Sequence, residues 1–241
     1  MTWSILALDP ATGAFGLAVS TKNFAVGAGV PFLRPGIGAC ATQSFSNRYL
    51  GPPALDALAR GLTPQQAIAS VIAGDEGRGL RQLHAIDRHG VSAAWTGENC
   101  VDFCGSVAAA GVSVAGNMLA GAAVIEDTLA AYLATDGILA ERLLAAMDAG
   151  QAAGGDRRGR QSAALFVITT EDFPDINIRV DDHPDPLIEL RRLLGIWRRD
   201  REPGLARAPR RADPAGQIDL DAIDAGFIAA GSPLRCRRLP G

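Results

Sequence analysis

Short apolar runs separated by turn residues open the chain and predict a β-hairpin. The two runs are WSILALD (3–9) and FGLAVST (15–21), and Pro10 and Gly13 lie between them. Along the first run, alternate side chains fall on opposite faces of a strand. Both faces are largely apolar, so we expect a strand that is buried on both sides.

Further along the chain, strand-like segments alternate with pairs of helical segments. Thr63, Pro64 and Gln66 give one helix a capping box, and Asp185 with Pro186 begins another. The expected strands are two within 24–43, divided around PFLRPG (31–36), then a hairpin over 81–97 and strands in 106–119, 161–170 and 176–182. The expected helices are 52–61, 62–74, 121–135, 137–150 and 183–197.

This order is neither a repeating βαβ pattern nor an all-β chain. Paired helices between groups of antiparallel strands are typical of sheets whose outer faces carry the helices. We expect an α+β fold with two stacked sheets between two helix layers, formed by one domain over 1–197. Residues 198–241 are rich in Arg, Pro, Ala and Gly, and predict a linker and a tail with one short helix over 218–231.

Composition restricts the classes of partner. The 241 residues carry a formal net charge of −3, which disfavours a nucleic-acid surface. No apolar segment approaches the ~20 residues that cross a bilayer, and no basic region precedes the first apolar run. The four cysteines show no regular framework, so reduced thiols and a cytoplasmic location are expected. No phosphate loop or nucleotide fingerprint is present, and no cofactor is predicted.

Three stretches together resemble a known family. They are residues 1–43, VAGNMLAG (114–121) and GQAAGGDRRGRQSAALFV (150–167), the last followed by RVDDHPDPLIELRRLL (179–194). They resemble the bacterial and archaeal family catalogued as domain of unknown function 1028, over about residues 1–197. The resemblance implies a fold like that of N-terminal-nucleophile (Ntn) hydrolases, a four-layer αββα sandwich. By analogy with that superfamily we also expect a homodimer.

In that superfamily a processed first residue attacks an amide carbonyl, and its own α-amine acts as the base. Thr2 fits this role once Met1 is removed, and its side chain is small enough to permit the removal. An α-amine has a pKa of roughly 7.7–8.0, so it accepts a proton near neutral pH. The alternative is that Thr2 is only a β-branched residue that begins a strand.

Residues near the first hairpin are candidates to assist Thr2. Lys22 ends the second strand and would oppose Thr2 in a simple register, where its ammonium would stabilise an alkoxide. Ser20 is a neighbouring candidate, and Arg34 could supply the positive charge instead. Each of them could equally be a structural or solvated residue.

Two later segments add candidates for substrate contacts. Asp156 and Ser162 stand where the resemblance implies supporting residues, although the spacing is longer than in proteasome subunits. Arginines in the same segment could clamp a carboxylate; they are Arg157, Arg158 and Arg160. Asn117 could donate to an oxyanion, or could form a turn before a helix.

Metal and thiol sites are disfavoured. His183 lies among aspartates, but the adjacent prolines favour a helix-capping loop. Cys100 and Cys104 lack a second ligand pair, so zinc is not expected. Cys40 lies in an apolar run, as buried cysteines usually do.

Two functions remain open from the sequence. The first is an amidohydrolase that acts on a small, acidic amide through Thr2. The second is a non-catalytic member of the fold that binds a small ligand or assembles with other proteins, and retains Met1. An enzyme that uses Cys40 or a histidine is a weaker third possibility.

Overall fold

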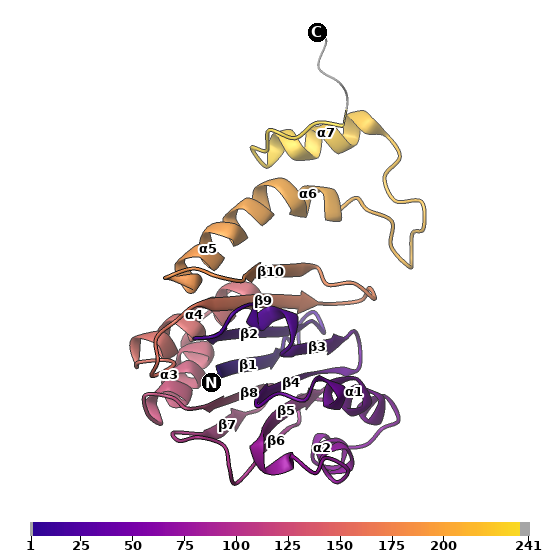
Figure 1. Cartoon of the computed structure of the whole chain (residues 1–241). Helices are drawn as coiled ribbons and strands as arrows, with labels where there is room; N and C mark the ends of the chain where they lie inside the picture. The colour runs from indigo at the N-terminus through magenta and orange to yellow at the C-terminus, as the bar shows by residue number, and fades with distance from the viewer. Residues whose placement is uncertain (1, 237–241) are drawn as a thin grey trace. The chain divides into compact units, whose positions relative to one another are not determined.

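Two antiparallel sheets form the core of residues 2–190 (Figure 1). The computed structural model describes residues 2–236. The six-stranded sheet has the order β10-β9-β2-β1-β8-β7, and the four-stranded sheet has the order β3-β4-β5-β6. The strands are β1 (Thr2–Leu8), β2 (Phe15–Thr21), β3 (Pro31–Arg34), β4 (Gly38–Ser44), β5 (Arg81–Asp87), β6 (Ser92–Thr96), β7 (Gly105–Ala109), β8 (Val112–Asn117), β9 (Ser162–Ile168) and β10 (Ile176–Val180).

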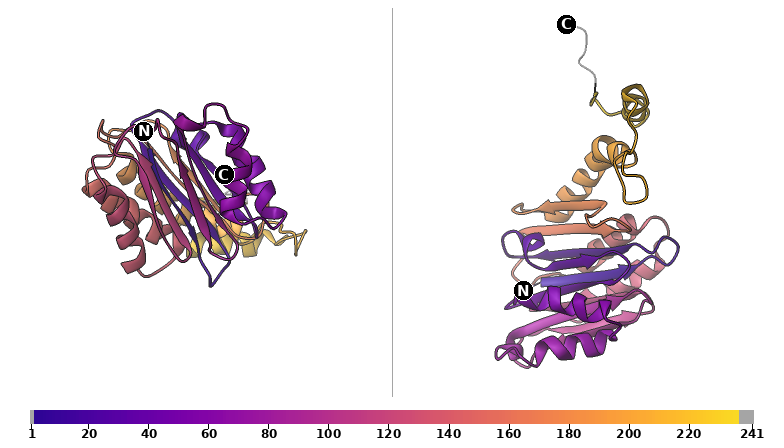
Figure 2. Two further views of the ribbon diagram at one scale, coloured as in Figure 1. Left: turned by 90° about the horizontal axis from the view of Figure 1, so that it is seen from below. Right: turned by 90° about the vertical axis from the view of Figure 1, so that its right-hand side faces the viewer.

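Helices cover the outer face of each sheet, as Figure 2 shows in its left view. The four-stranded sheet packs against α1 (Gly51–Ala59) and α2 (Pro64–Ile72). The six-stranded sheet packs against α3 (Ala123–Ala134) and α4 (Leu139–Ala152). The fold class is therefore α+β, a four-layer αββα sandwich, which confirms the expected architecture.

Apolar side chains fill the space between the sheets. Leu6, Leu17 and Val19 from the larger sheet pack with Ile86 from the smaller one, and all are fully buried. On the helix side, a Cβ on Gly16 would lie 2.5 Å from Leu143 Cδ1, so a glycine is required where α4 approaches β2. Every residue of β1 up to Ala7 is buried, which confirms the strand predicted to be buried on both sides.

One predicted region differs. PFLR was expected to divide two strands, but it forms β3, and the strand expected before it is a 3₁₀ turn, η1 (Val26–Ala28). The backbone amide of Val26 bonds the Ser162 hydroxyl at 3.1 Å, and Ala25 has a left-handed φ of 54°. A contact from a distant segment thus shapes this loop, which local alternation could not indicate.

The chain divides into two units, Met1–Leu190 and Arg191–Gly241. The boundary between these units lies within α5 (Pro186–Ile196). In the second unit the predicted short helix is confirmed as α7 (Leu220–Ala229), which Asp219 caps. Within the part of the chain that the structure describes, no helix is both long and apolar enough to span a membrane.

Candidate functional site

Thr2 begins β1, between the neighbouring strands β2 and β8. Its side chain faces the smaller sheet, as does that of Ser4, and it is only 6% exposed. The Thr2 hydroxyl donates to the Thr21 hydroxyl on β2 at 3.3 Å. On the other side Asn117 pairs with Thr2 and donates from Nδ2 to the Thr2 carbonyl at 3.3 Å. Both neighbouring strands therefore position Thr2.

A pocket of about 90 Å³ opens onto Thr2. Thr2 is its only lining residue from β1; the others come from the loop after β2 (23–30) and from the end of β4 and the turn that follows (43–48). Arg48 is its only charged lining side chain among the residues described, and it is exposed. The pocket therefore combines the Thr2 hydroxyl with one cationic group.

Backbone strain concentrates around this pocket. Three non-glycine residues in the described chain have a positive φ: Ala25 (54°), Ser44 (69°) and Met118 (56°). Ala25 and Ser44 line the pocket, and Met118 directly follows Asn117. Such conformations cost about 1–3 kcal/mol each and persist where the surrounding structure imposes them, which is common at functional sites.

A buried polar network connects the two sheets beneath the pocket. Gln43 and Gln82 are paired on neighbouring strands of the smaller sheet, and Asn117 lies on the larger sheet. Gln43 Nε2 donates to Gln82 Oε1 at 2.8 Å, and Asn117 Nδ2 donates to the same oxygen at 2.9 Å. Gln82 Nε2 donates in turn to carbonyls of the larger sheet, including that of Gly116 at 2.8 Å. Because Asn117 also holds the Thr2 carbonyl, the network fixes the start of β1.

The hydrogen-bond directions in this network assign the tautomer of His84. Ser4 donates its hydroxyl proton to Gln43 Oε1 at 2.7 Å, so it accepts from His84 Nε2 at 2.8 Å. The other ring nitrogen, Nδ1, then accepts from the Ser113 hydroxyl at 3.0 Å. Burial lowers the pKa of His84 to about 3, so the imidazole is neutral at physiological pH.

The neutral His84 predicts an acid-sensitive fold. Because the folded pKa is about 3 and the unfolded value 6.5, the unfolded state binds more protons between these pH values. Stability is complete above pH 6.5 and is lost as the pH falls toward 3. At pH 5 this group alone should cost about 2 kcal/mol of unfolding free energy.

Urea unfolding at pH 7.5 and pH 5 of the native protein and His84→Gln measures this effect. Glutamine does not titrate, so the stability advantage of the native protein should shrink by about 2 kcal/mol at the lower pH. An advantage that is the same at both pH values would contradict a buried neutral imidazole.

Lys22, Asp156 and Ser162 support the loop that lines the pocket. Thr21, not Lys22, opposes Thr2, and the exposed Lys22 ammonium donates to the Arg160 carbonyl at 3.3 Å. The Lys22 amide donates to Asp156 Oδ2 at 2.7 Å, and the Ser162 hydroxyl donates to the Asn23 carbonyl at 2.6 Å. The predicted role of Lys22 required the ammonium to face Thr2, and the register of the hairpin places Thr21 there instead.

Two other predicted residues do not direct a free polar group at the Thr2 hydroxyl. Both Asn117 Nδ2 protons are used by Thr2 and Gln82, so they are not available to an oxyanion. Ser20 is buried and points to the opposite face of the sheet from Thr21, where it donates to the Ser162 carbonyl at 3.4 Å.

The predicted arginines are paired with carboxylates. Arg34 bonds Asp56 at 2.8 Å, and the other two pairs are Arg158–Asp156 at 3.2 Å and Arg160–Asp185 at 2.6 Å. The Arg157 side chain is exposed, and it does not line the pocket. The proposed clamp for an acidic substrate therefore does not form from these residues.

The thiol and histidine alternatives receive little support. Cys40 is fully buried in the apolar cluster under α1 and α2, and burial raises the pKa of its thiol to about 12. His183 Nδ1 accepts from the Asp185 amide at 2.9 Å, as a capping loop requires. Over the described residues, no group of three or more His, Cys, Asp or Glu side chains could hold a metal ion.

Sequence reasoning missed the residues that complete the site: Thr21, Arg48, Gln43, Gln82 and His84. One signal was available, because Gln82 and His84 interrupt an otherwise apolar strand with polar side chains on one face. No local signal marks Arg48, which reaches the pocket only through the turn after β4.

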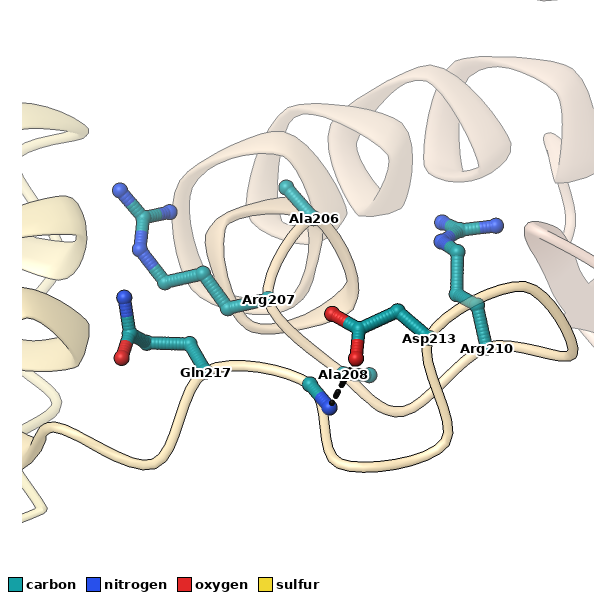
Figure 3. Close-up of a pocket in the computed structure, with 7 residues that line it drawn as sticks. Ala206, Arg207, Ala208, Arg210, Asp213 and Gln217 are labelled. Atoms are coloured by element: carbon teal, nitrogen blue, oxygen red, sulfur yellow. Dashed lines mark hydrogen bonds between the residues drawn. The ribbon is translucent and has the colours of Figure 1, made fainter.

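The second unit contains a separate pocket of about 300 Å³ in the loop between α6 (Glu202–Leu205) and α7. Figure 3 shows its side chains and the bond from the Gly216 amide to Asp213, at 3.3 Å. Arg207 bonds the carbonyls of Pro203 and Ala222, which ties the loop together. The pocket presents no hydroxyl or thiol side chain among its described lining residues, so it is not the candidate site.

Comparisons with known proteins identify the family. The model of a family of unknown function, DUF1028, matches residues 2–190. The crystal structure of protein SPO2555 from Silicibacter pomeroyi, described with the same family model, is similar to this chain at 35% identity. The alignment covers 90% of this chain and 96% of that one, with a TM-score of 0.85.

More distant likenesses are also found. Eukaryotic HslV from Trypanosoma brucei is 13% identical over 70% of this chain and 99% of that one, with a TM-score of 0.45. Anbu (ancestral beta-subunit) from Yersinia bercovieri is 14% identical over 81% and 94%, with a TM-score of 0.37. Both likenesses are too weak to carry an inference about this chain. None of the curated proteins compared with the chain matches it. The family match and the similarity to SPO2555 agree, and the chain belongs to the family of unknown function DUF1028.

Proposed function

We propose that this protein is an N-terminal-nucleophile amidohydrolase that acts on a small amide bearing a carboxylate. The observation that carries the proposal is the placement of Thr2. It is the first residue of a central strand, its side chain lines a small pocket, and both neighbouring strands fix it. Removal of Met1 would convert the Thr2 amide nitrogen into a free α-amine beside its own hydroxyl.

The chemistry requires no other general base. The α-amine takes the proton of the Thr2 hydroxyl while Oγ1 attacks the amide carbon, and the resulting ammonium protonates the departing amine. The acyl group is then an ester of Thr2. Water hydrolyses this ester, giving its proton to the α-amine and releasing the acid and the free hydroxyl. The Thr21 hydroxyl, which accepts from Thr2 at 3.3 Å, is placed to orient the nucleophile.

Arg48 supports an acidic substrate. Its side chain has no ion-pair or hydrogen-bond partner among the described residues, and a guanidinium binds carboxylates in a bidentate way. Gly29 allows this placement, because a Cβ there would lie 2.5 Å from Arg48 Nε. The pocket volume of about 90 Å³ favours a small substrate.

The intact mass of the untagged protein, combined with a screen of small amides, tests the proposal. Loss of one methionine and hydrolysis of amides that carry a carboxylate, in preference to their neutral analogues, are the expected results. If all of the protein retained Met1, and the amides bound but were not hydrolysed, the result would contradict the proposed hydrolase and favour the non-catalytic alternative. That alternative draws on one observation: the Lys22 ammonium is directed to the Arg160 carbonyl, not to Thr2.

Gly29→Ala tests the role of Arg48. The added methyl group should displace the flexible guanidinium at small cost to folding, because the clash is with the far end of a side chain. We expect KM for the acidic amide to rise several-fold with kcat nearly unchanged. Arg48→Gln should raise KM about 10-fold or more, as charge-assisted hydrogen bonds to the substrate are lost.

Steady-state kinetics of both single variants and of the double variant make the test specific. Once Arg48 is glutamine, Gly29→Ala should add little, because the side chain that it displaces no longer binds the carboxylate. Gly74→Ala is the matched control, since a Cβ there would meet nothing within 4 Å. Fully additive effects would show that Gly29 does not act through Arg48.

A further inference from the structure

A second, larger pocket lies at the opposite end of β1 from Thr2. Its volume is about 330 Å³, near the lower end of the range for small-molecule sites, about 300–1,000 Å³. Leu8 at the end of β1, the turn glycines Gly90 and Gly111, and the α3 residues Tyr132 and Leu133 line it, together with Arg142 of α4. Strands and helices that are far apart in the sequence thus converge on one cavity.

Backbone hydrogen bonds make the strand-side wall of this pocket rigid. The Leu8 amide donates to the Gly111 carbonyl at 2.9 Å, and the Gly111 amide donates to the Gly90 carbonyl at 3.0 Å. Both glycines have a φ of 75°, which side chains rarely adopt. Three hairpin ends are therefore locked together, so the cavity is formed before any ligand arrives.

Arg142 places a positive charge in this pocket. Its guanidinium lies 4.2 Å from the centre of the Tyr132 ring, and this contact with the face of the ring orients it. Its Nε is buried without a hydrogen-bond partner, and none of the described residues forms an ion pair with it. A guanidinium N–H that is removed from water normally finds an acceptor, and none of the described residues supplies one to Arg142 Nε.

Tyr132 gives a second, independent indication of a ligand. The side chain is 3% exposed, and its hydroxyl has no hydrogen-bond partner in the described chain. Burial raises the pKa of Tyr132; the charge of Arg142 opposes this shift, and the nearby Asp9 adds to it. A buried hydroxyl that is unsatisfied is costly, so it usually marks a place where another polar group binds.

A carboxylate that interacts with Tyr132, that of Asp9, is already used in its own turn. Asp9 accepts from the Ala11 amide at 3.2 Å and from the Thr12 hydroxyl at 2.7 Å, both within its own turn. It therefore holds the β1–β2 hairpin together and does not pair with Arg142. The remaining lining is predominantly apolar, and Leu133 is 55% exposed beside it.

We propose that this pocket binds a small organic carboxylate with an aromatic body, whose carboxylate pairs with Arg142 and whose ring packs against Leu133 and the hairpin ends. The lining holds one guanidinium and one exposed imidazole, that of His89, among mostly apolar residues. This set fits a monocarboxylate better than a phosphate, which recruits several cationic and amide donors. The described lining of this pocket includes no serine, threonine or cysteine side chain, and the pocket is separated from Thr2 by the length of β1. It is thus a binding site in addition to the proposed catalytic pocket.

Isothermal titration of the full-length protein with 3-phenylpropionate and with its neutral analogue, 3-phenylpropanamide, tests this inference. The carboxylate should bind with a dissociation constant of about 0.1–1 mM, and the amide at least 10-fold more weakly. Arg142→Gln should weaken carboxylate binding at least 10-fold. Arg60→Gln, which removes an exposed arginine elsewhere, should leave it unchanged.

Two further variants keep the result unambiguous. Leu133→Trp should fill the pocket and block binding while leaving Arg142 in place, and it decides the question if Arg142→Gln does not fold. Thr2→Ala should bind the carboxylate as the native protein does, which separates this site from the catalytic pocket. Equal affinity for the acid and the amide, no binding of the acid up to several millimolar, or unchanged binding in Leu133→Trp would overturn the proposal.

Discussion

Thr2→Ala should abolish amide hydrolysis, lowering kcat by about 10³-fold or more, because the substitution removes the only atom that attacks the substrate. The other residues of the pocket should keep their structure in this variant. The substitution removes the hydroxyl hydrogen bond from Thr2 to Thr21, so the expected loss of unfolding free energy is about 1 kcal/mol. Steady-state assays on the amide identified by the screen, together with urea unfolding, measure both effects.

Thr2→Ser is the matched control. Serine keeps the nucleophile and, like alanine, is small enough for Met1 to be removed, so the masses of both variants should show the same processing. Thr2→Ser should retain a substantial part of the activity. Full activity in Thr2→Ala, with its fold and processing intact, would show that another group performs the chemistry and that the proposed function is wrong.

The fold was predictable because its signals are local. The capping box of Thr63 and Gln66 begins α2 as expected. Pairs of helical segments separate the groups of strands in the sequence, and this order predicts helices on the outer faces of two sheets. Residues 24–34 are the exception to this agreement between prediction and structure. Here Ser162, at least 136 positions away in the sequence, bonds both the Asn23 carbonyl and the Val26 amide. That long-range anchor imposes a 3₁₀ turn where apolar residues and glycines suggested a strand.

The candidate site was less predictable, because it depends on register and on loops. Thr2 could be selected from its place at the start of a core strand. The residue that lies opposite Thr2 could not be predicted, because a shift of one residue in the hairpin register replaces Thr21 with Lys22 at that position. Arg48 reaches the pocket from the turn that follows Ser44, and Ser44 has a left-handed backbone conformation. Serine rarely adopts this conformation, so the sequence could not predict the turn.

The inter-sheet network explains how the site keeps its geometry. A strand terminus normally frays, yet here the Thr2 carbonyl is held by Asn117, and Asn117 by Gln82. Gln82 in turn reaches the carbonyls of Gly105 and Gly116, at 3.2 and 2.8 Å. Networks of this kind are rigid when every member is satisfied, and costly when one member is lost.

Gln82→Leu should therefore destabilise the protein more than any other single change considered, by about 3 kcal/mol or more. Leucine is similar in size, but Gln43 and Asn117 would each lose an acceptor, and the buried Gly116 carbonyl and the part-buried Gly105 carbonyl would lose a donor. Gln65→Leu, at an exposed position of α2, should change the unfolding free energy by less than about 0.5 kcal/mol.

Urea unfolding and steady-state kinetics measure separately the effects of Gln82→Leu on stability and on catalysis. Under conditions where Gln82→Leu remains folded, Asn117 has lost one of its two anchors, so Thr2 should be held less tightly and kcat should fall with little change in KM. A variant that lost stability but kept the full kcat would show that the network supports only the fold. A variant as stable as the native protein would show that the buried amides contribute nothing that a leucine cannot replace. The expected result, a loss of both, would mean that the polar layer between the sheets holds the nucleophile in place.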